Sequence, residues 1–266
     1  MPKLSLEREI LSFVALGDSF TEGLDDPYPD SADTPDGRYR GWADRVAEHL
    51  AGQVPEVRYA NLAVRGKLIR QIIDDQLPLA MDLRPDLITF CAGGNDILRP
   101  GSGDPDTLAG LFRDAVARLC ETGATVVVFT GMDVGSQPVM RRMRGKIATY
   151  NMHIRAVADE FGCPVVDLWG MKPLQDPRAF GWDRLHLSPE GHRRVALRVC
   201  ELLGVPVEDD WRAPWPAQDP LPWPDARLQD LHWAKEFLLP WIQRRLTGQS
   251  SGDGMRPKRP RLEPVR

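Results

Sequence analysis

The chain has 266 residues, of which 42% are hydrophobic and 27% are charged, and its formal net charge at pH 7 is −4. This length and composition can supply one sizeable buried core, which favours one large α/β domain over two small ones. The acidic balance argues against a nucleic-acid partner, because surfaces that bind nucleic acid are strongly basic. No apolar run approaches the roughly 20 residues of a membrane-spanning helix, so we expect no membrane span.

Cysteine usage and the N-terminal sequence both favour a cytoplasmic protein. The four cysteines are widely spaced, form no Cys-x-x-Cys pair and lie in or beside apolar runs, which is typical of buried free thiols in a reducing compartment. They are Cys91, Cys120, Cys163 and Cys200. Near the N-terminus, Glu7 and Arg8 interrupt any apolar stretch, so the pattern of a secretory signal peptide is missing there.

The first half of the chain alternates short apolar runs with amphipathic stretches. Residues 12–17 predict a strand that ends at a glycine, and residues 39–51 predict a helix. A second strand is expected at 57–63, followed by a helix over 69–81 that is clearest in its first half. Residues 86–93 predict a third strand, because they are apolar and are bounded by a proline and by two glycines.

The same alternation continues through the second half. Residues 105–122 predict a helix, and 125–131 form a continuous apolar run, as expected of a strand whose two faces are both covered. Over 140–161, apolar side chains recur at steps of three and four, which predicts a long helix with one buried face. Residues 164–169 predict the fifth strand. A last core helix over 188–204 starts with serine as N-cap and proline as its first residue.

Strands that alternate with helices predict a parallel sheet covered on both faces, that is, a three-layer α/β/α fold with five parallel strands. In such sheets the ligand site lies beyond the carboxyl ends of the strands. We therefore expect the functional residues to follow different strands and to come from distant parts of the chain.

The sequence changes character near residue 205, so we expect a catalytic domain at 1–204 and an extension at 205–247. Five of the eight tryptophans lie between residues 211 and 241, and prolines are frequent, which is incompatible with regular structure in that linker. An amphipathic helix is expected at 226–247. We expect the extension to pack on the domain, although it could instead cover the cleft or bind a partner. Residues 248–266 are rich in Gly, Ser, Pro and charge, and predict a disordered tail.

Candidate catalytic residues follow three of the predicted strands. Ser19 lies in Gly-Asp-Ser-Phe-Thr-Glu-Gly after the first strand, where its hydroxyl can project into a cleft. Gly66 follows the second strand, and Asn95 follows the third within Gly-Gly-Asn-Asp. A glycine lets backbone approach a ligand, and an asparagine amide can donate a hydrogen bond. Each of these patterns, taken alone, also fits an ordinary turn.

Asp183 and His186 follow the fifth strand, three residues apart and just before the helix that Ser188 caps. The carboxylate can hold the imidazole Nδ1–H and leave Nε2 to accept the proton of a serine. Ser19, Asp183 and His186 together meet the requirements of acyl transfer, because a serine hydroxyl needs an adjacent base. The backbone N–H groups of Ser19 and Gly66 and the amide of Asn95 would stabilise the oxyanion.

In these four sequence blocks the chain resembles the GDSL-type, or SGNH, hydrolase family, which is named for a Ser, Gly, Asn and His. The blocks occur in order and span about residues 12–200, although the first reads Gly-Asp-Ser-Phe where the family name has Leu. The resemblance implies a flavodoxin-like fold and ester hydrolysis without a cofactor or a metal. It leaves the substrate open among lipases, esterases, carbohydrate acetylesterases and thioesterases.

Other polar residues near the blocks have plainer interpretations. Asp18 and Asp96 are expected to shape loops by hydrogen bonding, and Arg65 to form a surface salt bridge rather than bind an anionic substrate. His192 follows His186 by six residues, but no accompanying ligand pattern supports a metal site.

Three functions remain open from the sequence. The first is a carboxylester hydrolase that forms a serine acyl-enzyme on small or short-chain acyl esters, with a small-molecule ester as substrate and the oligomeric state left open. The second is an acyltransferase or a carbohydrate or metabolite deacetylase that uses the same site. The third is a non-catalytic binding protein built on a hydrolase fold, which the intact triad disfavours.

Overall fold

The structure is a computed structural model that describes residues 9–28, 39–99, 103–137, 139–219, 222–240, 243 and 250–265. No helix within these ranges combines the length and the apolar character needed to cross a bilayer.

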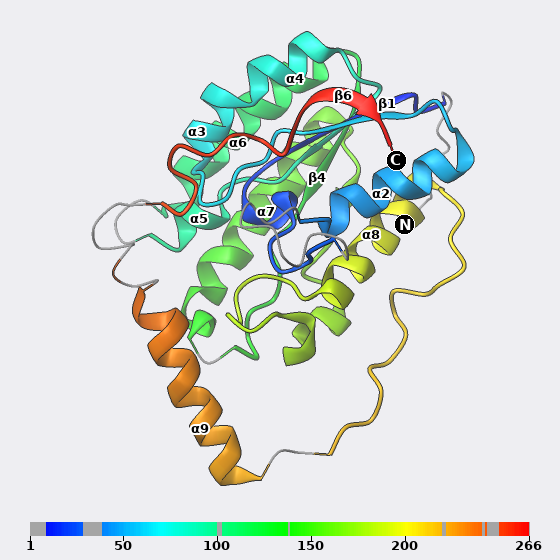
Figure 1. Cartoon of the computed structure of the whole chain (residues 1–266). Helices are drawn as coiled ribbons and strands as arrows, with labels where there is room; N and C mark the ends of the chain where they lie inside the picture. The colour runs from blue at the N-terminus through cyan, green and yellow to red at the C-terminus, as the bar shows by residue number, and fades with distance from the viewer. Residues whose placement is uncertain are drawn as a thin grey trace.

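A mostly parallel sheet forms the centre of the molecule (Figure 1). Its first five strands are β1 (Ser12–Leu16), β2 (Arg58–Asn61), β3 (Leu87–Phe90), β4 (Thr125–Phe129) and β5 (Val165–Val166). They pair in parallel in the order β5-β4-β3-β1-β2, and each lies within one of the five predicted runs.

A sixth strand corrects the predicted strand count. β6 (Arg259–Pro264) pairs antiparallel with β2, so the sheet has six strands in the order β5-β4-β3-β1-β2-β6. Its charged, proline-containing sequence lacks the apolar alternation of a strand. An edge strand tolerates both features, because only one of its sides needs backbone partners.

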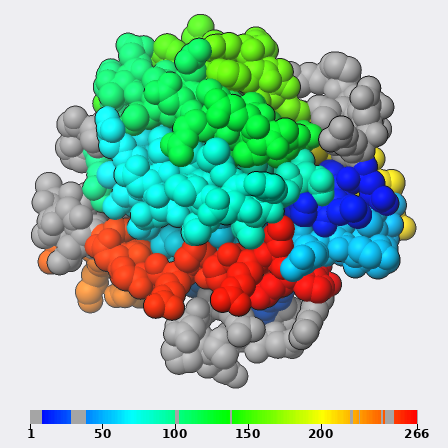
Figure 2. Space-filling model, turned by 90° about the horizontal axis from the view of Figure 1, so that it is seen from above, coloured from blue at the N-terminus to red at the C-terminus, as the bar shows by residue number. Residues whose placement is uncertain are grey.

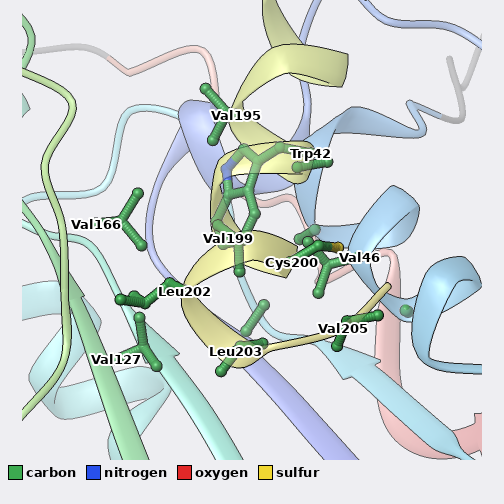
Figure 3. Close-up of a cluster of buried hydrophobic side chains, with 14 of the residues drawn as sticks. Trp42, Val46, Val127, Val166, Val195, Val199, Cys200, Leu202, Leu203 and Val205 are labelled. Carbon is green, nitrogen blue, oxygen red and sulfur yellow. The ribbon is translucent and has the colours of Figure 1, made fainter. Parts of the chain in front are cut away.

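Helices cover both faces of the sheet and complete the three predicted layers. On one face α2 (Gly41–Gln53) packs beside α8 (Pro189–Leu203), and alternate strand residues such as Val127 and Val166 join the same apolar cluster (Figure 3). The other face is covered by the helices that follow β2, β3 and β4, which pack on the remaining strand residues. These are α3 (Ile69–Asp75), α4 (Leu77–Leu83), α6 (Pro105–Cys120) and α7 (Arg144–Phe161).

Two short helices, α1 (Ser19–Glu22) and α5 (Gly94–Ile97), begin close to the ends of β1 and β3. The predicted helix over 69–81 is divided at Gln76, whose side chain bonds both the N–H and the C=O of Gly17. Among the described residues of the domain there are three 3₁₀ turns: η2 (Met140–Met143), η3 (Lys172–Gln175) and η4 (Pro177–Ala179).

After α8 the chain leaves the three layers as an extended linker that two tryptophans attach to the domain. The indole N–H of Trp211 donates to Glu201 at 2.8 Å, and that of Trp215 donates to the Pro173 carbonyl at 2.9 Å. The linker leads to α9 (Trp223–Trp233), followed by a π-helical turn, η5 (Ala234–Leu238). Figure 1 shows α9 outside the three layers. Its Trp223 and Leu231 are exposed.

The C-terminal segment differs from the predicted disordered tail. Residues 250–254 form a turn, and 259–264 form β6 on the sheet edge. The reason is that Lys258 anchors the segment: its amine binds two backbone carbonyls and a carboxylate of the domain. Composition alone does not reveal such a contact. Residues 248, 249 and 266 lie outside the described ranges, as does part of the predicted 226–247 helix.

Candidate active site

Ser19 lies at the carboxyl end of β1, as the sequence predicts. β1 ends at Leu16 and α1 begins at Ser19, with Asp18 as N-cap accepting from the Phe20 N–H at 3.1 Å. Gly17 is needed in between, because a Cβ there would lie 2.9 Å from the Cys91 carbonyl oxygen. This close approach brings the turn of Ser19 against the chain that follows β3.

Asp183 and His186 form a hydrogen-bonded pair. His186 Nδ1 lies 2.5 Å from Asp183 Oδ2, and Asp183 Oδ1 accepts the backbone N–H groups of Leu185 and His186, both at 2.9 Å. This geometry assigns the proton to Nδ1 and leaves Nε2 as the acceptor.

The environment keeps the Asp183 carboxylate charged. Burial alone would raise the pKa of Asp183, but the hydrogen bond and charge of His186 and the two backbone N–H groups outweigh burial and lower it below its usual value. A charged carboxylate is the form that can orient the imidazole and stabilise an imidazolium.

Asn95 connects the nucleophile turn to the loop of Gly66. Its Nδ2 donates to Asp18 Oδ2 at 3.0 Å and to the Lys67 carbonyl at 3.2 Å. Gly66 has φ +72°, in the left-handed region, and a Cβ there would lie 2.0 Å from Ser250 Oγ. Gly66 is therefore in contact with the C-terminal turn, one residue from the carbonyl that Asn95 binds.

Ser19, Asn95 and His186 line one pocket of about 190 Å³. Asp183 and Gly66 are outside the lining: Asp183 supports His186 from behind, and Gly66 faces the C-terminal segment. The rest of the wall is largely apolar and includes Phe20, Leu98, Phe129, Met132, Ile147 and Ile154. The structure thus brings three of the five predicted site residues to one cavity.

Asp25 is a neighbour of the pair that the sequence did not single out. Its φ is +69°, and a Cβ on Gly181, two residues before Asp183, would lie 2.0 Å from Asp25 Oδ2. Burial and the charge of Asp183 raise the pKa of Asp25, while His186 opposes the shift. In the sequence, Asp25 stands in a polar run with nothing to distinguish it from a surface residue.

His192 is a buried, neutral histidine rather than a metal ligand. Its Nδ1 accepts the Trp42 N–H at 3.2 Å, its Nε2 donates to the Leu24 carbonyl at 3.0 Å, and burial lowers its pKa to about 4. Within the part of the chain that the structure describes, no group of three or more His, Cys, Asp or Glu residues could hold a metal ion.

The remaining residues have structural roles near those expected. Arg65 pairs with Glu22 and lies over the Tyr39 ring, in a half-buried rather than a fully exposed salt bridge. Asp96 accepts the Ile69 N–H at 3.0 Å and so fixes the start of α3.

Comparison with known proteins places this chain in a family. The model of the GDSL-like lipase/acylhydrolase family matches residues 15–194. No curated protein sequence matches the chain.

Solved structures similar to the chain share its fold. An α/β hydrolase from the metagenome of Lake Arreo, Spain, is 24% identical with a TM-score of 0.61, over 73% of this chain and 95% of its own. An acetylxylan esterase from Geobacillus stearothermophilus is 21% identical with a TM-score of 0.58, over 77% and 98%. A G-D-S-L family lipolytic protein from Veillonella parvula is 20% identical with a TM-score of 0.57, over 73% and 98%. The chain belongs to the GDSL-like lipase/acylhydrolase family and is an ester-hydrolysing enzyme.

Proposed function

We propose that the enzyme hydrolyses carboxylic esters through an acyl-enzyme on Ser19, with His186 as general base and Asp183 as its orienting carboxylate. The observation that supports this most is the 2.5 Å Asp183–His186 contact beside a pocket that Ser19 also lines. A serine hydroxyl is a weak nucleophile until a base removes its proton, and the pair supplies that base.

The two half-reactions follow from these positions. Ser19 Oγ attacks the ester carbonyl carbon while His186 Nε2 takes its proton, and the imidazolium then protonates the leaving alcohol. In the second half, His186 takes a proton from water, the resulting hydroxide attacks the acyl carbon, and the acid leaves as Ser19 Oγ is protonated again. If another alcohol replaces water, the same steps give acyl transfer.

The oxyanion that forms in each half needs donors. We assign the backbone N–H of Ser19 and the Nδ2 of Asn95 as the first two, with the Gly66 N–H as the third. Asn95 Nδ2 donates to Asp18 Oδ2 and, over the longer 3.2 Å contact, to Lys67 O. An oxyanion in the pocket would compete with the longer contact, since a charged acceptor makes the stronger hydrogen bond.

The shape of the pocket favours an acyl group longer than acetyl. An apolar cavity of about 150 Å³ in another protein holds benzene, so the pocket here, of about 190 Å³, has room for roughly six carbons. Ile147 and Ile154, both largely buried, form part of its wall. A deacetylase on an acetylated carbohydrate, as the name of the Geobacillus enzyme suggests, would leave most of this apolar volume unfilled.

Labelling with a fluorophosphonate probe tests the nucleophile. We expect the wild-type chain to be labelled and the Ser19→Ala variant to remain unlabelled but folded, because a turn serine contributes little to the core. Labelling of Ser19→Ala at the wild-type rate would remove Ser19 from the mechanism, and a folded wild-type chain that stays unlabelled would favour a non-catalytic binding protein.

A series of p-nitrophenyl esters from acetate to decanoate tests the pocket. We expect kcat/KM to rise from acetate to about hexanoate and then to fall, and Ile147→Phe to move the optimum to a shorter chain. An optimum at acetate that Ile147→Phe leaves unchanged would support the deacetylase instead. Adding methanol and measuring the ratio of methyl ester to free acid separates hydrolysis from acyl transfer.

A further inference from the structure

Two segments that follow the catalytic domain, α9 and residues 250–265, contact two loops of the candidate site. The family model ends at residue 194, so neither α9 nor the segment 250–265 belongs to the matched part of the chain. Both return to residues that the proposed mechanism uses, one on the acid–base loop and the other on the loop of Gly66.

α9 holds the acid–base loop from outside. The indole N–H of Trp233 donates to the backbone carbonyl of Asp183 at 2.8 Å. The next residue, Arg184, pairs with Asp230 of α9 at 2.7 Å, and its guanidinium lies 4.9 Å from the centre of the Trp233 ring. Arg184 has φ +56°, a conformation that residues with a Cβ rarely adopt. The loop therefore has a constrained backbone whose contacts with α9 fix two consecutive residues.

Apart from these contacts, α9 contributes little to the core. Trp223 is 72% exposed, and Leu228 and Leu231 are exposed as well. A helix kept only for stability would bury its apolar side chains against the domain. In α9 the most specific attachment is to the loop of Asp183.

The turn at 250–254 holds the loop of Gly66 (Figure 2, where the C-terminal segment is red and lies on the cyan part of the chain). A Cβ on Gly252 would lie 1.9 Å from the Arg65 carbonyl oxygen, so the two backbones touch there. Ser250 lies against Gly66 and accepts the Gly252 N–H at 3.2 Å. The turn thus covers two consecutive residues of the loop.

Hydrogen bonds and an ion pair carry this contact to the nucleophile. Arg65 pairs with Glu22, at the end of the short helix that Ser19 begins. Lys67 accepts from Asn95, which also binds Asp18, next to Ser19. A displaced turn would therefore change the position of the oxyanion donors.

We propose that α9 and the C-terminal turn at 250–254 position the catalytic residues. Trp233 of α9 fixes the Asp183–His186 loop, and Gly252 of the turn fixes the Gly66 loop. This inference rests on the proposed function. Both are positioning residues: they touch no substrate and act through the loops that they hold. Misplacing a reacting group by about 1 Å can cost two orders of magnitude in rate, so a looser loop reduces kcat more than it changes KM.

The contact of α9 with the Asp183 loop is tested by Trp233→Phe, which removes the indole N–H and keeps a ring beside Arg184. Trp223→Phe is the control, because it makes the same change at an exposed position of the same helix. With the best p-nitrophenyl ester, at a temperature well below unfolding, we expect Trp233→Phe to lower kcat roughly threefold or more, with KM within about twofold. Trp223→Phe should keep the wild-type kcat.

The contact of the turn with the Gly66 loop is tested by Gly252→Ala, whose Cβ forces the backbone of the turn away from that of Arg65. Gly110→Ala is the matched control, because a Cβ at Gly110 meets nothing within 4 Å. We expect the same fall in kcat for Gly252→Ala and none for Gly110→Ala. If Gly252→Ala does not fold, Ser250→Ala replaces it, since it removes the hydroxyl that lies against Gly66.

Melting temperatures separate positioning from stability. A variant at Trp233 or in the turn that melts earlier but keeps the wild-type kcat would overturn the inference for its loop and leave a purely structural extension. A wild-type chain that is folded yet hydrolyses no ester would instead defeat the proposed function itself.

Discussion

Lys258→Met should destabilise the protein strongly, because Lys258 anchors β6 through a buried ion pair. Its side chain is 14% exposed, and its amine donates to the carbonyls of Tyr39 at 2.6 Å and Arg40 at 3.0 Å. The same amine lies 2.9 Å from Asp44 Oδ1. Methionine fills a similar volume but offers no charge and no donor.

The expected magnitude follows from what remains around Asp44. This carboxylate is 2% exposed and would retain the hydroxyls of Tyr59 at 2.7 Å and Tyr28 at 2.6 Å, with Arg259 at 4.0 Å. Breaking a buried ion pair costs about 3–5 kcal/mol. Burial lowers the pKa of Lys258 although Asp44 counteracts it, so part of the gain from pairing is already offset. We therefore expect the lower end, about 3 kcal/mol.

Thermal unfolding followed by circular dichroism measures this change. For a chain of this size, 1 kcal/mol shifts Tm by about 2–4 °C, so Lys258→Met should melt roughly 6–12 °C below the wild type. Lys146→Met, at an exposed position of α7, is the control and should shift Tm by less than about 2 °C. Combining Lys258→Met with Asp44→Asn should cost less than the sum of the two single changes. A Lys258→Met variant whose Tm equals that of Lys146→Met would refute the role of Lys258 as a buried anchor.

Three further predictions concern the site and its pH dependence. Asp183→Asn should lower kcat by about 10⁴ in the ester assay while circular dichroism shows an intact fold, because the amide favours the wrong imidazole tautomer; a loss below tenfold would contradict that role. Asn95→Ala should lower kcat by about 10²–10³ and change KM little, and an unchanged rate would remove Asn95 from the oxyanion hole. The pKa of His192 falls from 6.5 to about 4 in the folded chain, so between these values the unfolded chain binds a proton that the folded chain does not. The contribution of His192 to the free energy of unfolding is therefore complete above pH 6.5 and is lost as pH falls towards 4. The free energy of unfolding, measured with urea at pH 7 and pH 5, should differ less between the two pH values for His192→Asn than for the wild type.

The sequence predicted the parts of the fold that depend on local patterns. The run at 125–131 shows this most clearly: β4 is apolar after its first residue, because both of its faces are buried. The positions of Ser19, Asn95 and His186 followed from topology, since the carboxyl ends of parallel strands meet at one edge.

The parts that were not predicted depend on contacts between distant residues. β6 has no strand pattern of its own and is fixed by Lys258 and by pairing with β2. The contact of Gly66 with Ser250, a residue from the far end of the chain, has no local pattern that could predict it. Asp25 approaches Asp183 because two loops meet, and no local pattern reports such a meeting.

The pairing of Arg58 with Pro264 has a consequence for how the molecule is made. During synthesis β2 leaves the ribosome long before its outer neighbour exists, so one side of the nascent sheet stays open for most of translation. Open strand edges can recruit other chains, which makes this interval the one most prone to aggregation. Slow steps in folding are expected here too, since the pairing joins segments about two hundred residues apart.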